Sequence, residues 1–370
     1  YAGDAEGDMV SPPAFPRWRH LEIASLDGSR SITSTVPICQ RINSGCSHSL
    51  LQHIFDDYIP VPTSSLNNTG PMSLSPLIRF GTSTWAYEGW QGQIYQRSYA
   101  KTTFARECLG EYCQYHFNGE PLFLTVGNDS TFYRPPTTNQ LDRYLTQIPE
   151  DFEMCFKVWE EITIPRFASH VRYGPKAGQP NPRFLDAKLF KELVLAPYRE
   201  AKFEPHMGPF IFEFQRHGLT SEEFCSRLNR FFSQLPNDFR YAVEIRNADL
   251  LGQDYRKVLE CHGVAHVYNH WSYMPQLLQQ HKRMEERFTA PFTVVRLLTP
   301  LNMSYEAAKK QAAPYNKIVE VLPQMRKETV TLIKQAVGEN RRAYVLVNNR
   351  SEGNAPLTVQ ALVSHLRHEE

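Results

Sequence analysis

Two charged side chains interrupt apolar segments of the sequence, and they are the first candidates for chemistry. Glu244 lies within Tyr-Ala-Val-Glu-Ile-Arg, and Lys157 follows Glu-Met-Cys-Phe. A charged group in such surroundings must find a partner or shift its pKa, and a shifted pKa suits a general acid or base. We therefore predict that Lys157 and Glu244 transfer protons. The alternative is that both only form structural ion pairs.

Arginine, aromatic and amide side chains near the same segments are candidates for ligand binding. Arg246 and Arg296 carry planar guanidinium groups that suit a carboxylate or a phosphate. Aromatic side chains between residues 85 and 133 offer faces for stacking a sugar ring or a base, although aromatics at strand ends also close cores. The predicted ligand is an anionic or polyhydroxylated small molecule. The predicted binding residues are Trp85, Tyr87, Asn128, Tyr133, Arg246, Arg296, Asn348 and Asn349.

The Asn348-Asn349 pair, followed by Arg350 and Gly353, allows two interpretations. After the last strand of a barrel, backbone amides often hold a phosphate. Asn and Gly also tolerate the left-handed geometry of an ordinary turn. Both roles can exist together.

A metal site is a further alternative. Glu213, Glu244 and His266 follow one another on successive predicted strands and offer the carboxylate and imidazole ligands of divalent-metal barrels that isomerise sugars or cleave phosphoesters. We assign no metal ligands and leave the cofactor open.

The elements that must position these residues alternate regularly along the chain. Short runs rich in β-branched and aromatic residues are each followed by a turn and a segment of helical periodicity, which predicts parallel strands with crossover helices. The predicted strands are Ile78–Gly81, Leu122–Val126, Glu153–Val158, Pro209–Phe214, Tyr241–Ile245, Ala265–Tyr268, Thr293–Leu297 and Ala343–Val347. The predicted helices are Asn139–Gln147, Ala187–Ala196, Ser221–Leu235, Gln253–His262, Met274–Met284, Tyr305–Val337 in pieces, and Leu357–Leu366.

Eight such units favour a closed (β/α)8 barrel of the α/β class. Runs such as PFIFEF and AYVLV are apolar throughout, as strands buried on both faces are. An open doubly wound sheet commonly has a G-x-G-x-x-G loop after its first strand, and RFGTSTW has none. In a barrel, reactive groups lie at the C-terminal ends of the strands, where all the candidates above are found.

Seven motifs also resemble, in order and spacing, the YecE-like family, also called domain of unknown function 72. The resemblance covers residues 77 to 367 and implies a (β/α)8 barrel with a patterned cleft. It implies no reaction, because the family has no established one. The motifs are RFGTSTWAYEGW (Arg79–Trp90), NDSTFYRPP (Asn128–Pro136), FKVWEEIT (Phe156–Thr163), MGPFIFEFQ (Met207–Gln215), YAVEIRN (Tyr241–Asn247), VVRLL (Val294–Leu298) and VNNRSEGNAP (Val347–Pro356).

The domain organisation follows from a change of composition near residue 75. Residues 1–75 are predicted to be a mostly irregular extension, because residues 11–75 are rich in Ser, Pro, Asn and Thr. Within it, Ser49–Ile59 has helical spacing. Residues 76–370 form the predicted barrel, with a long insert at 167–205.

The composition of the chain argues against several classes of protein. The 40 basic and 39 acidic side chains give a formal net charge of +1, so no overall field favours nucleic acid or a membrane. Seven cysteines without a C-x-x-C pair argue against a disulfide framework or a zinc knuckle. No apolar run approaches the roughly 18 residues of a membrane span, and residues 1–9 lack the apolar core of a secretory signal. We predict a cytoplasmic protein with a small-molecule ligand and no membrane partner, nucleic acid being less favoured.

Three functions remain open at this point. The first is an enzyme with Lys157 and Glu244 as acid and base. The second is a metal-dependent phosphoesterase, nuclease or sugar isomerase. The third is a barrel that binds a partner without catalysis, because this fold hosts unrelated functions.

Overall fold

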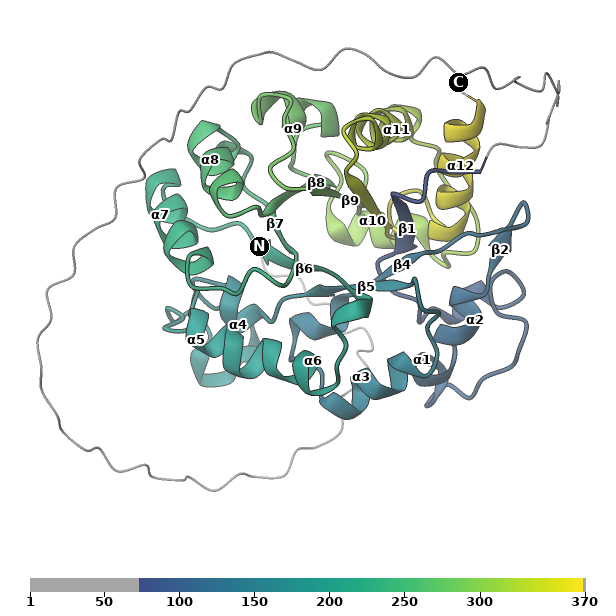
Figure 1. The fold of residues 1–370 in the computed structure, drawn as a ribbon, viewed down its shortest axis with the longest axis horizontal. Coiled ribbons are helices and arrows are strands. Elements are labelled where there is room, and N and C mark those ends of the chain that lie inside the picture. Colours follow the sequence, from purple (N-terminus) through teal and green to yellow (C-terminus); the bar gives the residue numbers. More distant parts are fainter. Residues whose placement is uncertain (1–72, 369–370) are drawn as a thin grey trace, which may run out of the picture. The chain divides into compact units, whose positions relative to one another are not determined.

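The computed structural model describes residues 73–368, and eight parallel strands form its centre (Figure 1). Their order in the sheet is β1-β10-β9-β8-β7-β6-β5-β4. The first and the last strand lie against each other, so the sheet forms a nearly closed (β/α)8 barrel, as predicted. The strands are β1 (Ile78–Thr82), β4 (Thr125–Asn128), β5 (Glu153–Lys157), β6 (Met207–Phe214), β7 (Tyr241–Ile245), β8 (Ala265–His270), β9 (Phe292–Leu297) and β10 (Arg342–Val347).

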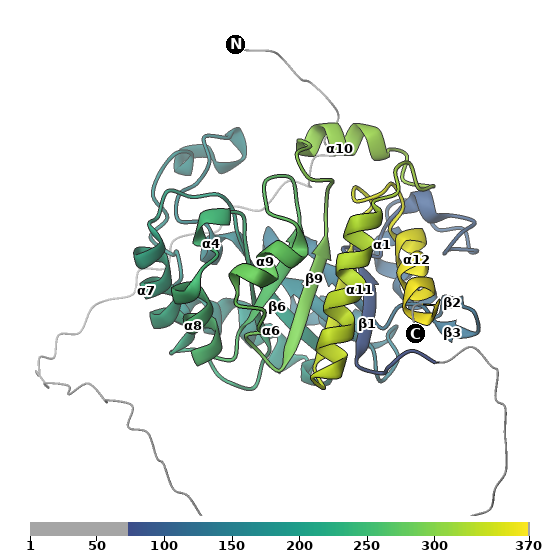
Figure 2. The ribbon, with the colours of Figure 1, turned by 90° about the horizontal axis from the view of Figure 1, so that it is seen from above.

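Helices surround the barrel, and α10 lies beyond one of its ends (Figures 1 and 2). Helix α7 begins at an N-cap, where the side chain of Thr220 accepts a hydrogen bond from the backbone N–H of Glu223. The helices are α1 (Phe104–Glu107), α2 (Leu109–Cys113), α3 (Thr138–Leu145), α4 (Glu160–Thr163), α5 (Ala187–Leu189), α6 (Ala196–Glu200), α7 (Ser221–Phe232), α8 (Gln253–Cys261), α9 (Leu277–Arg283), α10 (Tyr305–Ala312), α11 (Pro323–Gly338) and α12 (Ala355–His368).

Several short elements were not predicted. Among them are α4, which follows β5, and, between β1 and β4, α1, α2 and the hairpin of β2 (His116–Phe117) and β3 (Glu120–Pro121). Each covers five residues or fewer, which is too short to show a helical or alternating period in the sequence.

The closure between β1 and β4 depends on a side chain from α2. The backbone N–H of Thr82 donates to the Tyr112 hydroxyl at 3.0 Å, and that hydroxyl donates to the carbonyl of Thr125 at 3.4 Å. The strands approach so closely that a Cβ on Gly81 would lie 2.1 Å from the Thr125 carbonyl oxygen. Gly81 is therefore required by the seam of the barrel.

Side chains alternate between two cores along the strands. Phe156, Phe212 and Val243 pack against the surrounding helices, in a large cluster rich in aromatic residues. Cys155, Ile211 and other residues, from six strands in all, make a smaller cluster that fills the inside of the barrel.

Two predictions concern the start of the chain. The helix at Ser49–Ile59 lies outside the described residues, and the domain boundary near residue 75 stays a prediction. Between residues 73 and 368, no helix has the length and apolar character needed to cross a membrane.

Candidate functional site

The alternation of inward and outward side chains continues to the C-terminal ends of the strands. Charged side chains that point to the inside of the barrel come together there. Each of these side chains lies two residues beyond a member of the inner apolar cluster. Because the side-chain period of a strand is two, both point to the inside of the barrel. The pairs are Cys155 and Lys157 on β5, Ile211 and Glu213 on β6, Ala242 and Glu244 on β7, Val267 and Asn269 on β8, and Val294 and Arg296 on β9.

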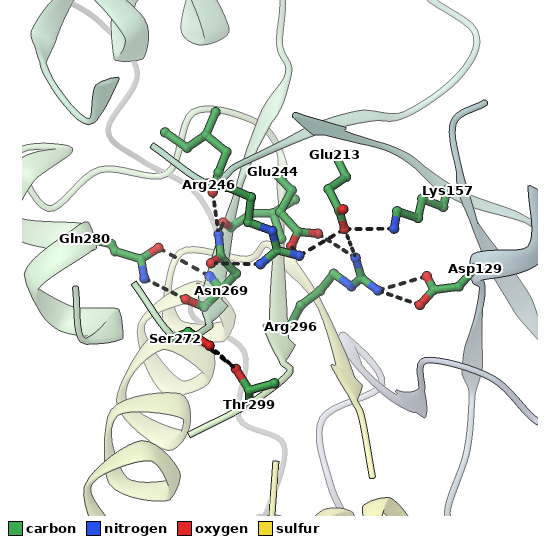
Figure 3. A network of polar contacts seen from close by, with 12 residues as sticks. Asp129, Lys157, Glu213, Glu244, Arg246, Asn269, Ser272, Gln280, Arg296 and Thr299 are labelled. Atoms are coloured by element: carbon green, nitrogen blue, oxygen red, sulfur yellow. Dashed lines mark hydrogen bonds and ion pairs between the residues drawn. The ribbon is translucent and has the colours of Figure 1, made fainter. Parts of the chain in front are cut away.

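Glu213 lies at the centre of this group and meets three cations (Figure 3). Its Oε2 is 2.9 Å from Lys157 Nζ, 2.9 Å from a terminal nitrogen of Arg246 and 3.6 Å from one of Arg296. Burial alone would raise the pKa of Glu213, but Lys157, Arg246 and Arg296 together lower that pKa below its ordinary value. Glu213 is therefore ionised throughout the neutral range.

Glu244 lies next to Glu213 in the strand register and is fully buried. One of its oxygens is 2.5 Å from Arg246, and the other is 2.6 Å from Arg296. Arg296 also donates to both oxygens of Asp129, at 2.9 and 3.1 Å. The network thus joins three carboxylates to three cations, and its charges balance.

Amide side chains hold the network in place (Figure 3). Gln280 of α9 donates to the backbone carbonyl of Asn269 at 2.8 Å, and Asn269 donates to the carbonyl of Ile245 at 3.2 Å. The oxygen of Asn269 in turn accepts a hydrogen bond from Arg246 at 3.4 Å. These bonds fix the orientation of the Arg246 guanidinium.

A cavity of about 450 Å³ opens above the network, and we call it the mouth cavity. Its floor includes Lys157, Glu213 and Arg246, whereas Glu244 does not line it. Five basic side chains face two carboxylates in the lining, so the cavity is electropositive. The charged and aromatic lining residues are Asp129, Lys157, Glu213, Arg216, Arg246, Trp271, Arg296, Tyr305 and Arg350.

Arg216 and Arg350 have no carboxylate partner among residues 73–368. Arg350 stacks on the ring of Tyr305 at 4.5 Å, and Arg216 lies 5.8 Å from the ring of Tyr273. A ring contact orients a guanidinium group and leaves its N–H donors available. Both arginines can therefore meet an anion in the mouth cavity.

The two predicted catalytic residues come close together but differ in access. Lys157 lines the mouth cavity, with its Nζ 4.1 Å from the centre of the Phe132 ring. Glu244 is sealed beneath the arginines. Glu213 is the carboxylate that pairs directly with Lys157 and also reaches the cavity.

Four of the eight predicted binding residues line one of two cavities. Arg246 and Arg296 line the mouth cavity, whereas Trp85 and Asn128 line a separate cavity of about 270 Å³. Trp85 is buried and donates its indole N–H to the carbonyl of Ala105. Neither cavity is lined by the aromatic rings at positions 87 and 133.

The remaining two aromatic residues make contacts outside the network. The Tyr87 hydroxyl donates to the carbonyl of Pro314 at 2.8 Å. Tyr133 is 62% exposed, and the guanidinium of Arg172 lies 5.3 Å from its ring.

Asn348 and Asn349 make the contacts of a turn. The side-chain oxygen of Asn348 accepts from the N–H of Arg350 at 3.0 Å, and that of Asn349 accepts from the N–H of Ala355 at 2.9 Å. Asn349 thus bonds to the first residue of α12. The loop still supplies one group to the mouth cavity, the side chain of Arg350.

The alternative metal ligands do not converge. Glu213 and Glu244 are paired with basic groups, while His266 bonds through Nδ1 to the hydroxyl of Tyr255 on α8 at 3.2 Å. Within residues 73–368, no group of three His, Cys, Asp or Glu side chains is arranged to hold a metal ion.

Four basic or aromatic residues of the mouth cavity were missed as binding residues in the sequence. Three of them lie in loops within three residues of a strand end, which is the signal that could have found them, whereas the one at the start of α10 has no such signal. They are Arg216, Trp271, Tyr305 and Arg350.

Comparison with known proteins identifies relatives over the whole barrel. The family model described as protein of unknown function DUF72 matches residues 79–370. A DUF72 family protein from Enterococcus faecalis has 16% sequence identity and a TM-score of 0.55, over 78% of this chain and 95% of its own. One from Thermotoga maritima has 19% identity and a TM-score of 0.51, over 79% and 99%. At these identities, the likeness shows the shared fold alone. No curated protein matches the chain.

Proposed function

The chain belongs to the DUF72 family, whose function is unknown, and we propose that its mouth cavity binds a small molecule bearing a phosphate or carboxylate group. One observation carries the proposal: Arg216 and Arg350 reach the cavity without a carboxylate partner among the described residues. Below them the charges of the network balance, so these two arginines give the cavity its excess of positive charge. An anion is the ligand that compensates it.

The aromatic residues of the lining favour a ligand that also carries a ring or a sugar. The guanidinium of Arg246 lies 4.7 Å from the ring of Trp271, and Tyr305 is 48% exposed beside Arg350. Such rings offer flat apolar faces next to charged donors. A sugar phosphate or a cyclic acid combines both features.

We assign proton transfer at this cavity to Lys157 and Glu213. Both reach the mouth cavity, and their charged atoms are 2.9 Å apart. A bound anion that pairs with Lys157 draws this cation away from Glu213, which raises the proton affinity of the carboxylate. Glu213 then gains the ability to accept a proton only after the ligand has bound. Glu244 keeps the arginines in place.

A thermal-shift screen of the full chain tests the proposal. Glucose 6-phosphate, glucose, orthophosphate, citrate and manganese chloride are compared, with Arg350→Ala and the exposed Arg230→Ala as a charge-matched control. We expect a phosphate or citrate to raise Tm in the wild type and the control but not in Arg350→Ala, because binding to the native state stabilises it. Stabilisation by manganese alone, or an equal effect in Arg350→Ala, would contradict the proposal.

A further inference from the structure

A second cavity, of about 800 Å³, borders the mouth cavity, and we call it the insert cavity. It lies between the insert that follows α4 and the loop that follows β6. Both cavities are lined by Gln215 and Arg216, at the end of β6. A ligand that pairs with Arg216 from the mouth cavity is therefore at the entrance of the insert cavity.

The insert cavity is basic and has no acidic residue in its lining. Besides Arg216, it is lined by Arg166 and Arg227. Arg166 donates one hydrogen bond to the carbonyl of Gly178 at 2.7 Å, and Arg227 pairs with Glu223 on the exposed surface of α7. Each guanidinium has five N–H donors, so both retain donors for a ligand.

His217 also lines the insert cavity and carries a donor without a partner among the described residues. Its Nδ1 accepts a hydrogen bond from the backbone N–H of Leu219 at 3.3 Å, so the proton of the neutral ring is on Nε2. Burial lowers the pKa of His217 and favours this neutral form. Nε2 is buried and has no partner in the described part of the chain.

Aromatic side chains separate these polar groups. Phe167 is buried in the wall of the insert cavity, and so is Phe184, over which the guanidinium of Arg227 lies at 5.8 Å. The cavity thus combines an apolar wall with basic groups around it, as the mouth cavity does. Its chemistry suits a second anionic group joined to the first by a short linker.

We infer that the ligand carries at least two anionic groups, one held in the mouth cavity and one in the insert cavity, with Arg216 between them. This inference rests on the proposed function of the mouth cavity. The class of ligand is a bis-phosphorylated or otherwise doubly anionic small molecule. A singly charged ligand uses only Arg216, Arg350 and the floor of the mouth cavity.

Calorimetric titration of the full chain with orthophosphate and with tripolyphosphate tests this. Tripolyphosphate carries three linked phosphate groups, whereas orthophosphate is a single one. The variant Arg166→Ala/Arg227→Ala removes the basic groups specific to the insert cavity. Arg199→Ala/Arg230→Ala removes the same charge elsewhere, because neither residue lines either cavity.

We expect the wild type and the control to bind tripolyphosphate at least about tenfold more tightly than orthophosphate. In Arg166→Ala/Arg227→Ala, this preference should disappear while orthophosphate affinity is unchanged. Equal affinities for the two anions in the wild type would overturn the inference, and so would a preference for tripolyphosphate that survives in this variant. The proposed binding of one anion in the mouth cavity would still stand. If the wild type binds neither anion, the proposed function itself fails.

Discussion

At the scale of single residues, the site separates side chains that hold the network from those that reach a ligand. Lys157, Glu213, Glu244 and Arg296 were recognisable in the sequence because charged residues in apolar strands need partners. How far each of these side chains lies from the cavity was not predictable. Glu213 and Glu244 are paired in the strand register, yet only Glu213 lines the cavity. Depth depends on the tilt and stagger of the strands, which the hydrophobic pattern does not contain.

Neutralising Glu244 should destabilise the protein strongly. The variant Glu244→Gln leaves Arg246 and Arg296 buried with one carboxylate fewer, and breaking a buried ion pair costs about 3–5 kcal/mol. Urea unfolding measures the loss. Glu339→Gln, which removes a partner of Arg341 at the surface, is the control and should cost less than about 1 kcal/mol. Similar losses in the two variants would show that the Glu244 pairs are not structural.

His266 should make the fold sensitive to mild acid. Burial lowers its pKa from 6.5 to about 3, so the folded state favours the neutral ring. Below pH 6.5 the unfolded state takes up a proton at this residue, whereas the folded state does so only near pH 3. The contribution of His266 to the free energy of unfolding is therefore complete above pH 6.5 and is lost as the pH falls from 6.5 toward 3. At pH 5 the loss from this group is about 2 kcal/mol. In His266→Phe, unfolding free energy should fall less between pH 7 and pH 5 than in the wild type. In the control His116→Phe, at an exposed position, the unfolding free energy should fall between pH 7 and pH 5 by as much as in the wild type. An equally large fall in His266→Phe would show that His266 is not the source of the acid sensitivity.

At the scale of elements, the sequence predicted the strands well and the loops poorly. All eight predicted strands overlap observed ones, because a strand buried on both faces appears as a short apolar run between turn residues. The segment between β1 and β4 has no such pattern, and its elements depend on tertiary contacts such as those of Tyr112. The loops that supply Trp271 and Arg350 to the mouth cavity likewise show no helical or strand periodicity in the sequence.

The seam between β1 and β4 should be the most sensitive point of the barrel to a small increase in side-chain size. Gly81→Ala places a methyl group against the Thr125 carbonyl, which belongs to the backbone and has little room to move. We expect a loss of about 1–3 kcal/mol in unfolding free energy, as for overpacked cores. Gly110→Ala is the control, since its Cβ would be 3.6 Å from the nearest atom, an ordinary contact. If the two variants have the same denaturation profile, β1 and β4 can move apart without a loss of unfolding free energy, which would contradict the prediction.

At the scale of the whole molecule, a chain with nearly balanced charge gathers positive charge around its two cavities. The formal net charge is +1, so composition predicted only that no overall field favours nucleic acid or a membrane. The fold brings basic residues from distant parts of the chain to the mouth cavity. The network neutralises Arg246 and Arg296, whereas Arg216 and Arg350 have no carboxylate partner among the described residues. Fields of this kind act on small ligands near the cavity and weaken with salt.

The measurement that tests this account most directly is calorimetric titration of orthophosphate into the wild type and into Arg216→Ala/Arg350→Ala, at low and at physiological salt. We expect saturable binding by the wild type that weakens with salt, and an affinity at least about tenfold lower in the variant. Equal binding by both proteins would contradict it, because the anion would then be held somewhere other than at the two unpaired arginines of the mouth cavity.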